Sequence, residues 1–170
     1  MTMEVHQING FEQLVNLCNR ELLNGTITKV SWLGFSDSPA ISVTNQAGSV
    51  AELAFGSIEW KLVLIAGDRV LATSEHDFAT FRPFVESCIG MTITEVSLRE
   101  QEGLAMSLLL DDALRLQMGS CDRNGNDEEA PCWELFCSDH HVLVVGMKYG
   151  EWRRIRKNTP LWPSGDAVRE

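Results

Sequence analysis

Thiol and imidazole side chains gather in the last third of the chain, and zinc prefers these ligand types. They are Cys121, Cys132, Cys137, His140 and His141. No two of these cysteines form a Cys-x-x-Cys pair, and Cys132 and Cys137 are five residues apart in a segment with strand character. Because odd and even positions of a strand face opposite sides, those two thiols should point apart. The spacing argues against zinc, although sequence alone leaves open whether Cys121, Cys132, Cys137 and His140 bind a metal. We expect no cofactor.

The acidic segment at residues 122–128 places oxygen donors at alternate positions, as the start of a calcium-binding loop does. An EF-hand loop needs glycine at its sixth position and a bidentate glutamate at its twelfth. Asp127 and Trp133 stand at those positions here. We therefore interpret the segment as a solvated acidic loop, with weak calcium binding as the alternative.

Side chains suited to nucleophilic or acid–base catalysis occur without the patterns that would arrange them. The chain has no Gly-x-Ser-x-Gly elbow, no phosphate-binding glycine loop and no His-Glu-x-x-His helix. The paired carboxylates of Asp111 and Asp112 fall in a predicted turn. We therefore predict a protein that is not an enzyme.

An internal repeat organises the elements that would position any site. Residues 25–31 (GTITKVS) are answered by residues 90–97 (GMTITEVS), with one inserted methionine. Further matches follow in the same order: residues 40–43 with 105–108, 55–57 with 118–120, 60–62 with 133–135, and 68–71 with 140–143. One acidic insertion, residues 121–131, accounts for the longer spacing of the last two matches. We predict a duplicated unit, with the first copy at residues 9–74 and the second at residues 75–147.

Each copy opens with apolar residues at helical spacing. The expected N-terminal cap pairs are Asn9 with Glu12 and Ser74 with Asp77. Gly25 and Gly90 are placed to end the two helices. Pro83 removes a backbone N–H inside the second pattern, so that helix should be kinked, broken or begin late.

The rest of each copy has the pattern of five short strands separated by turn formers. In the first copy they are Thr26–Leu33, Ala40–Thr44, Ser49–Phe55, Glu59–Ile65 and Arg69–Thr73. In the second copy they are Thr92–Leu98, Leu104–Leu110, Ala113–Met118, Trp133–Cys137 and Val142–Gly146. Short connections favour antiparallel pairing, so the predicted class is α+β, with one helix and an antiparallel five-strand meander in each copy.

The two copies should share a core, because a unit of about 65 residues is near the size at which a lone core is marginal. We expect them to pack as one pseudo-two-fold domain that includes residues 1–170. Trp60 and Trp133 occupy matching positions at the start of apolar strands, and we interpret them as core anchors. The sequence does not indicate how the two sheets join.

Charge divides the chain into an acidic body and a basic tail. The 170 residues have a formal net charge of −10; residues 1–147 carry 8 basic and 21 acidic groups, and residues 148–170 carry 6 and 3. We expect the tail, residues 148–170, to be irregular and to clasp the acidic body, with capture of an acidic partner as the alternative. An acidic surface repels phosphate groups, so nucleic acid is not the expected partner.

The chain shows no pattern for secretion or membrane insertion. Residues 1–10 lack a basic start and an apolar stretch, and the longest unbroken apolar run is residues 62–66. The five cysteines are an odd number, which fits reduced, buried thiols. We expect a cytoplasmic protein with no membrane partner and leave its oligomeric state open.

Acidic side chains of the second copy fall largely in predicted turns at strand ends, and such a field attracts a basic protein. The residues expected to bind this partner are Glu100, Glu102, Asp111, Asp112, Asp122, Asp127, Glu128 and Glu129.

One hairpin and the general character of the chain carry a resemblance. The segment Trp133-Glu134-Leu135-Phe136, with a short turn before Val142-Leu143-Val144, in a small acidic protein without catalytic motifs resembles the small immunity proteins of bacterial toxin systems and related uncharacterised bacterial domains. The resemblance implies a non-catalytic module that binds a basic toxin domain and covers its cleft with carboxylates. A small-molecule or metal-binding domain that uses the cleft between the two copies is the first alternative, and an enzyme of unrecognised type is the second.

Overall fold

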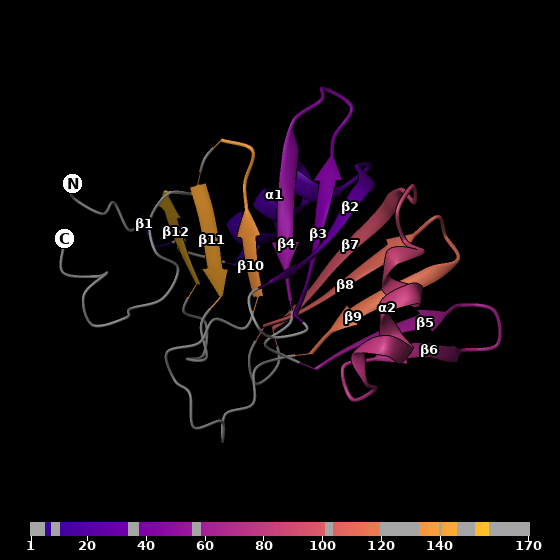
Figure 1. Cartoon of the computed structure of the whole chain (residues 1–170). Helices are drawn as coiled ribbons and strands as arrows, with labels where there is room; N and C mark the ends of the chain where they lie inside the picture. Colours follow the sequence, from indigo (N-terminus) through magenta and orange to yellow (C-terminus); the bar gives the residue numbers. More distant parts are fainter. Residues whose placement is uncertain are drawn as a thin grey trace, which may run out of the picture.

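A computed structural model describes residues 6–7, 11–33, 38–55, 59–100, 104–119, 133–139, 141–145 and 152–156 (Figure 1). Its helices are α1 (Phe11–Leu22) and α2 (Phe78–Glu86). The first six strands are β1 (His6–Gln7), β2 (Thr26–Leu33), β3 (Ser38–Thr44), β4 (Val50–Ala54), β5 (Trp60–Leu64) and β6 (Arg69–Thr73). The others are β7 (Ile93–Glu100), β8 (Leu104–Leu110), β9 (Leu114–Met118), β10 (Trp133–Phe136), β11 (His141–Val145) and β12 (Trp152–Arg156). The predicted α+β class, with two helices each followed by antiparallel strands, is confirmed.

The strands form two antiparallel sheets that exchange a hairpin between the repeat copies. Sheet A has seven strands in the order β1-β12-β11-β10-β4-β3-β2, and sheet B has five in the order β6-β5-β9-β8-β7 (Figure 1). In sheet A, β4 pairs with β10 of the second copy, and in sheet B, β9 pairs with β5 of the first. The first three strands of each copy form a meander, and the remaining hairpin lies in the other copy's sheet. This exchange is how the two sheets join.

The two copies meet at equivalent residues. Thr26 and Thr92 match in the repeat, and they form an isolated antiparallel bridge. The backbone hydrogen bonds around it form two related pairs: Ile27 N–H to Met91 O (2.9 Å) with Ile93 N–H to Gly25 O (2.8 Å), and Asn24 N–H to Ile93 O (2.8 Å) with Gly90 N–H to Ile27 O (2.7 Å). Exchanging the copies maps each bond onto its partner, so a local pseudo-two-fold axis passes between Thr26 and Thr92.

A β-bulge recurs at the same repeat position in both copies. The register shifts between Ile27 and Lys29 in β2 and between Ile93 and Glu95 in β7. The hydroxyls of the bulged residues each donate to the neighbouring strand, Thr28 to Ser42 O at 3.4 Å and Thr94 to Leu109 O at 3.3 Å. A bulge increases local strand twist, so both sheets bend where the copies meet.

The register tests the matches made from sequence. Leu62 pairs with Leu116 and Leu135 pairs with Leu53, so the match of residues 60–62 with 133–135 is confirmed. Ser42 pairs with Lys29, and Leu109 pairs with Glu95. Because Lys29 and Glu95 are equivalent, Ser42 corresponds to Leu109, and the predicted match of residues 40–43 with 105–108 is wrong by two residues.

The second helix begins three residues later than the predicted cap Ser74 implies, and Pro83 lies inside it. α2 starts at Phe78, and the Asp77 carboxylate accepts a hydrogen bond from the Thr80 N–H at 2.8 Å. Ser74, the predicted cap, instead accepts from the Trp60 N–H at 3.2 Å. Ser74 therefore ties the end of β6 to the start of β5, and the chain needs three more residues before it can turn into the helix.

The end of the first helix also differs. The residue with a left-handed backbone after α1 is Asn24 (φ 63°), at the position that Gly90 (φ 93°) occupies after α2. Asparagine tolerates this conformation better than most residues, so Asn24 terminates the helix. Gly25 has a different role, because a Cβ at this position would overlap Cγ1 of Val43. The predicted cap Asn9 lies outside the described residues.

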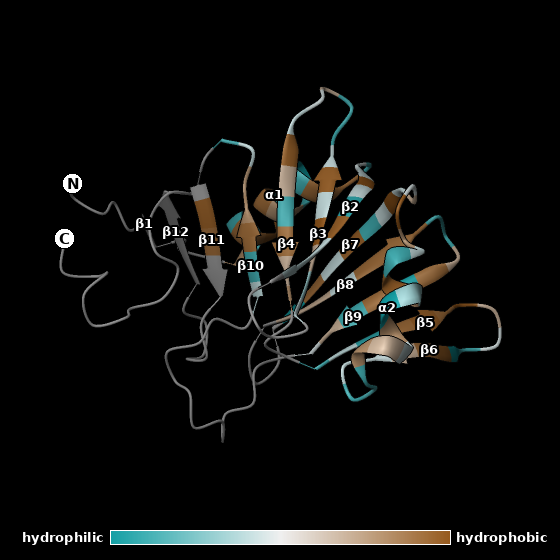
Figure 2. Ribbon diagram, viewed as in Figure 1, coloured by the Kyte–Doolittle hydropathy of each residue, from teal (hydrophilic) through white to brown (hydrophobic). Residues whose placement is uncertain are grey.

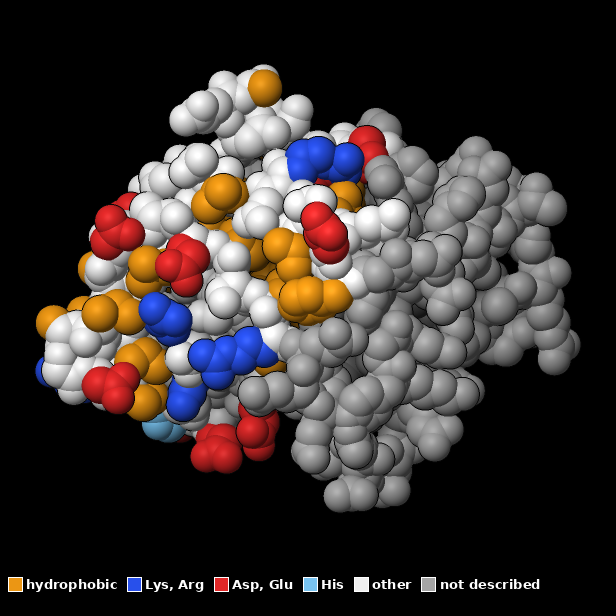
Figure 3. All heavy atoms as spheres, turned by 180° about the vertical axis from the view of Figure 1, so that it is seen from behind, with side chains coloured by type: hydrophobic (Ala, Val, Ile, Leu, Met, Phe, Trp, Pro, Cys, Tyr) orange, Lys and Arg blue, Asp and Glu red, His pale blue; other side chains and the backbone are white. Residues whose placement is uncertain are grey.

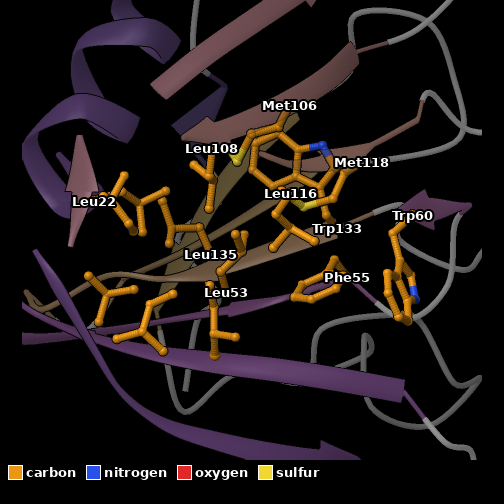
Figure 4. Packing of buried hydrophobic residues seen from close by; sticks show 14 of the residues in the cluster. Leu22, Leu53, Phe55, Trp60, Met106, Leu108, Leu116, Met118, Trp133 and Leu135 are labelled. Carbon is orange, nitrogen blue, oxygen red and sulfur yellow. The ribbon is translucent and has the colours of Figure 1, made fainter. Parts of the chain in front are cut away.

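Both sheets and both helices contribute to one buried hydrophobic cluster. Figure 4 shows Leu53 and Leu135 of sheet A in the same cluster as Leu108 and Leu116 of sheet B. Trp60 and Trp133 are 3% and 1% exposed, so their predicted role as core anchors is confirmed. In Figure 2 the strands alternate between hydrophobic and hydrophilic positions, as strands with one buried face do.

Aromatic rings hold α2, of the second copy, against strands of the first copy that lie in different sheets. Phe81 lies with its ring centroid 5.1 Å from Trp60 of β5 and 5.9 Å from Trp32 of β2. Trp32 also packs edge-on against Phe78 at 4.9 Å. Because β2 and β5 belong to different sheets, the helix closes one end of the shared core. α1 packs in turn against β7 of the second copy.

Part of the tail is a strand, which corrects the expectation of an irregular tail. β12 pairs along its length with β11, and β1 pairs with β12. Residues 152–156 are therefore joined to the body by backbone hydrogen bonds.

None of the described helices is long and apolar enough to cross a membrane.

We expect Gly25→Ala to lower the free energy of unfolding by about 1–3 kcal/mol, because the added methyl group overlaps Val43 in a packed joint. Shortening the neighbour in the double variant Gly25→Ala/Val43→Ala should restore space, so the double variant should be more stable than the sum of the single effects implies. Urea unfolding of the wild type, the two single variants and the double variant measures this coupling. Strictly additive losses would contradict a close contact between these two residues.

Candidate ligand groove on the outer face of sheet B

A hollow of about 430 Å³ lies on the face of sheet B that points away from the core. Strands of both repeat copies line it, β5 and the end of β6 from the first copy and β7, β8 and β9 from the second. We call it the outer groove, and its main polar and small lining residues are Glu59, Lys61, Thr73, Glu75, Ser97, Arg99, Ala105, Ser107, Arg115, Gln117 and Gly119. The groove exists because the exchanged hairpin places β5 beside β9.

One row of hydrogen-bonding side chains crosses all five strands. Thr73 pairs with Lys61, Lys61 with Gln117, Gln117 with Ser107, and Ser107 with Ser97. Residues directly opposite each other in a sheet point to the same face, so these five side chains form a polar line across the groove. Adjacent strands lie about 4.8 Å apart, so the line is roughly 19 Å long.

A second row adds two small residues to the groove floor. Ala105 pairs with Arg99, and Gly119 donates its N–H to Glu59 O at 2.8 Å. Gly119 and Ala105 therefore lie in the middle of the groove floor, with Glu59 and Arg99 at its two ends. Glycine in or beside a strand often marks a place where another backbone approaches closely.

The groove gathers cations that form no ion pair with the carboxylates that the structure describes. The ion pairs found among the described residues join Arg20 to Glu21, Arg20 to Asp139, and Arg82 to Glu86. Lys61, Arg99 and Arg115 form no ion pair with any described carboxylate. In Figure 3, Lys and Arg side chains gather over sheet B in the view from behind, with Asp and Glu side chains around them. The groove thus has unpaired positive charge in a chain whose net charge is −10.

Two positions on the equivalent face of sheet A carry the opposite charge. Glu134 follows Trp133 in β10 as Lys61 follows Trp60 in β5. Glu134 pairs with Ala54, two residues from Glu52, in the same way that Lys61 pairs with Gln117, two residues from Arg115. The acidic pair of sheet A therefore corresponds to a basic pair in the groove of sheet B.

Glu134 is a buried carboxylate without a full set of partners. Its residue is 7% exposed, and Oε2 has no hydrogen-bond partner among the residues that the structure describes. Burial, together with the nearby Glu52 charge, raises the pKa of Glu134 from 4.5 to about 7. Perturbed carboxylates of this kind are common at functional sites and also occur as structural acid pairs.

The acidic residues predicted to bind a basic partner are not brought together where the structure describes them. Glu100 lies at the end of β7 and pairs with Leu104, whereas Asp111 and Asp112 follow the other end of β8. The six steps along β8 from Leu104 to Leu110 separate these points by roughly 20 Å. Glu102, Asp122, Asp127, Glu128 and Glu129 lie outside the described residues.

Asp111 and Asp112 are engaged in local structure. Asp111 Oδ1 accepts from the Thr92 N–H at 2.8 Å, and Asp112 Oδ1 accepts from the Thr94 hydroxyl at 2.7 Å. Both aspartates have left-handed backbone conformations, with φ of 51° and 55°. They stabilise the turn beside the joint between the copies, and partner binding through them stays a prediction.

Cys137 is the one predicted metal candidate that the structure describes, since Cys121, Cys132 and His140 lie outside the described residues. Its thiol and carboxylate oxygens of Glu21 and Asp139 lie within 4.8 Å of one another. Glu21 is already engaged, because Oε2 accepts from the Ser138 hydroxyl at 2.9 Å and Oε1 accepts from Arg20 at 3.0 Å. These contacts join α1 to the turn after β10.

The described thiols are buried. Cys18, Cys88 and Cys137 are free cysteines, as the interpretation of buried reduced thiols expects. Burial raises the pKa of Cys18 far above its usual range, and it raises the pKa of Cys88 to about 12. Metal binding requires the thiolate, so burial disfavours it at Cys18.

Comparisons with protein-family models, with curated proteins and with solved structures find no match for this chain. The geometry of the site therefore carries the functional argument.

The groove residues could not be grouped from the sequence because they lie in several strands that are far apart along the chain. Lys61 sits between buried residues of β5, and Arg115 and Gln117 alternate with the buried leucines of β9. This alternation identifies them as outward-facing. Only the exchange of the hairpins brings β5 and β9 side by side, and no local pattern signals that exchange.

We expect wild-type stability to fall relative to that of Glu134→Gln as pH rises from about 4 to about 8. The unfolded chain ionises Glu134 near pH 4.5 and the folded chain only near about 7, so ionisation of the unfolded state draws the equilibrium away from the native state over this interval. The relative loss is at most about 3 kcal/mol. Glu52→Gln should reduce it, because the neighbouring charge contributes to the raised pKa. Urea unfolding across this pH range measures the difference, and parallel pH profiles of wild type and Glu134→Gln would contradict it.

Proposed function

We propose that the protein is a non-catalytic protein-binding module whose outer groove holds a negatively charged segment of its partner. The carrying observation is the group of Lys61, Arg99 and Arg115, which line one hollow and lack described ion-pair partners. Unpaired cations around a groove bind carboxylates through charge-assisted hydrogen bonds. The hollow of about 430 Å³ is formed by both repeat copies, as a cleft between them would be.

The row of polar side chains across the groove favours ligand binding over catalysis. Ser97, Ser107 and Gln117 donate and accept hydrogen bonds, and none of the groove residues pairs a nucleophile with a histidine. The lysine and arginines are half-buried or exposed, so a ligand in the groove can reach them. These groups suit recognition of an anionic, hydrogen-bonding ligand.

A basic partner held by the acidic surface is the second candidate, and the net charge of −10 favours it. In its most concrete form this is the immunity-type role, in which carboxylates cover the cleft of a basic toxin domain. The two candidates differ in the sign of the partner's charge, so one pair of probes separates them.

The test uses fluorescent tetraglutamate and tetralysine with the full chain, followed by fluorescence anisotropy. Tetraglutamate should bind, and the double variant Lys61→Gln/Arg115→Gln should weaken binding by at least about tenfold, because each charge-assisted contact contributes about one factor of ten or more. Added salt should weaken it further, since exposed charges are screened.

The matched control is Lys29→Gln/Arg69→Gln, which removes the same charge from exposed positions that do not line the groove. Its affinity should stay close to that of the wild type. Equal losses in both double variants would contradict groove binding and indicate a general charge effect. Binding of tetralysine alone would favour the acidic-surface candidate.

A further inference from the structure

The spacing of the cations restricts the ligand, and this step rests on the proposed function of the groove. Arg99 lies in β7, two strands from Arg115 in β9. Arg99 is opposite Ala105, which is level with Gly119, four residues along β9 from Arg115. With about 4.8 Å between strands and 3.4 Å per residue, the two Cα atoms are roughly 17 Å apart.

Lys61 lies near Arg115 and far from Arg99. It is opposite Gln117, so it is one strand and two residues from Arg115, or roughly 8 Å. From Arg99 it is three strands and two residues away, or roughly 16 Å. The cations therefore form two poles, Lys61 with Arg115 at one end and Arg99 at the other, and one small anion binds one pole at a time.

The floor between the poles suits a main chain. It is made of Gln117 and Ser107 with the small residues Ala105 and Gly119. Small side chains let another backbone come close, and the hydroxyl and amide groups can hydrogen-bond its N–H and C=O groups. Trp60, which also borders the groove, is only 3% exposed and offers little ring surface for stacking a planar or sugar-like ligand.

We propose that the outer groove binds an extended peptide segment with two acidic residues four positions apart, one at each pole. In an extended chain, residues i and i+4 point to the same side and lie roughly 14 Å apart, which long lysine and arginine side chains readily span to the two poles. The segment crosses sheet B diagonally, over Ser107 and Ala105. Glu59 and Glu75 border the β5–β6 side, so they repel further acidic residues there and limit the ligand to the two that the poles accept.

The test compares two seven-residue peptides of equal composition and charge, both built from Gly and Ser with two glutamates. One peptide has the glutamates four positions apart, and its isomer has them adjacent. We expect the spaced peptide to bind the full chain about tenfold more tightly, because it alone engages both poles. Arg99→Gln should remove this advantage and leave both peptides with similar, weaker affinity.

A second variant tests whether the peptide main chain lies on the groove floor, and it does so without changing the charge of the groove. Ala105→Leu fills the groove floor at a partly exposed, outward-facing position, so the fold should be retained. It should weaken the spaced peptide while leaving the weak binding of inorganic phosphate unchanged. Glu59→Gln/Glu75→Gln should strengthen binding of a peptide that carries a third glutamate.

The outcomes separate this inference from the proposed function. Equal affinity for the two isomers, or efficient displacement of the spaced peptide by inorganic phosphate, would overturn the two-pole ligand while anion binding in the groove remained. Failure of both peptides and of phosphate to bind would overturn the proposed function itself. Circular dichroism of each variant shows whether a loss of binding reflects a loss of fold.

Discussion

Backbone pairing between the two repeat copies is the constraint on which the rest of the structure depends. Sheet A is continuous only because β10 of the second copy lies beside β4, and sheet B only because β5 of the first lies beside β9. A strand that loses its neighbour leaves a row of backbone donors and acceptors without partners, which is costly wherever water cannot replace them. Each copy therefore needs the other to complete its sheet. The arrangement is that of a hairpin-swapped dimer whose two subunits are joined in one chain.

The two-fold relation between the copies is strict in the backbone at their joint and is broken in the charges of side chains that point away from the core. The bridge between Thr26 and Thr92 and the bulges beside it recur residue for residue. On the faces that point away from the core, Glu134 and Glu52 of sheet A stand where sheet B has Lys61 and Arg115. Core packing restricts the matching residues of the two copies to similar shapes, whereas residues that point away from the core can differ in charge. The outward-pointing residues that differ in charge between the two copies are therefore the best candidates for a specific function.

The strands were predictable to within one or two residues for most elements because each alternates clearly and ends at a turn former. β2, β6 and β8 have the predicted bounds. β12 was missed because its Trp-Arg-Arg-Ile-Arg pattern has no strand-like alternation, and it is a strand because β11 offers it an edge. Ser74 was misassigned as a cap because its hydroxyl satisfies Trp60, a partner far away in the sequence. The groove could not be predicted from the sequence for the same reason, since the strands that line it pair only in the folded chain.

The sign of the groove's charge does not follow from the sign of the whole chain. Charges separated by more than about 8 Å in physiological salt are largely screened, so a bound carboxylate responds mainly to the side chains lining the groove. At lower ionic strength, where screening is weaker, the chain's net charge of −10 repels an acidic ligand and slows its encounter. Binding of an acidic segment therefore becomes favourable only after its carboxylates reach Lys61, Arg99 and Arg115. A diffuse polyanion meets the repulsion without reaching both poles of the groove. An acidic body around a cationic groove thus favours a short segment of defined spacing over negative charge in general.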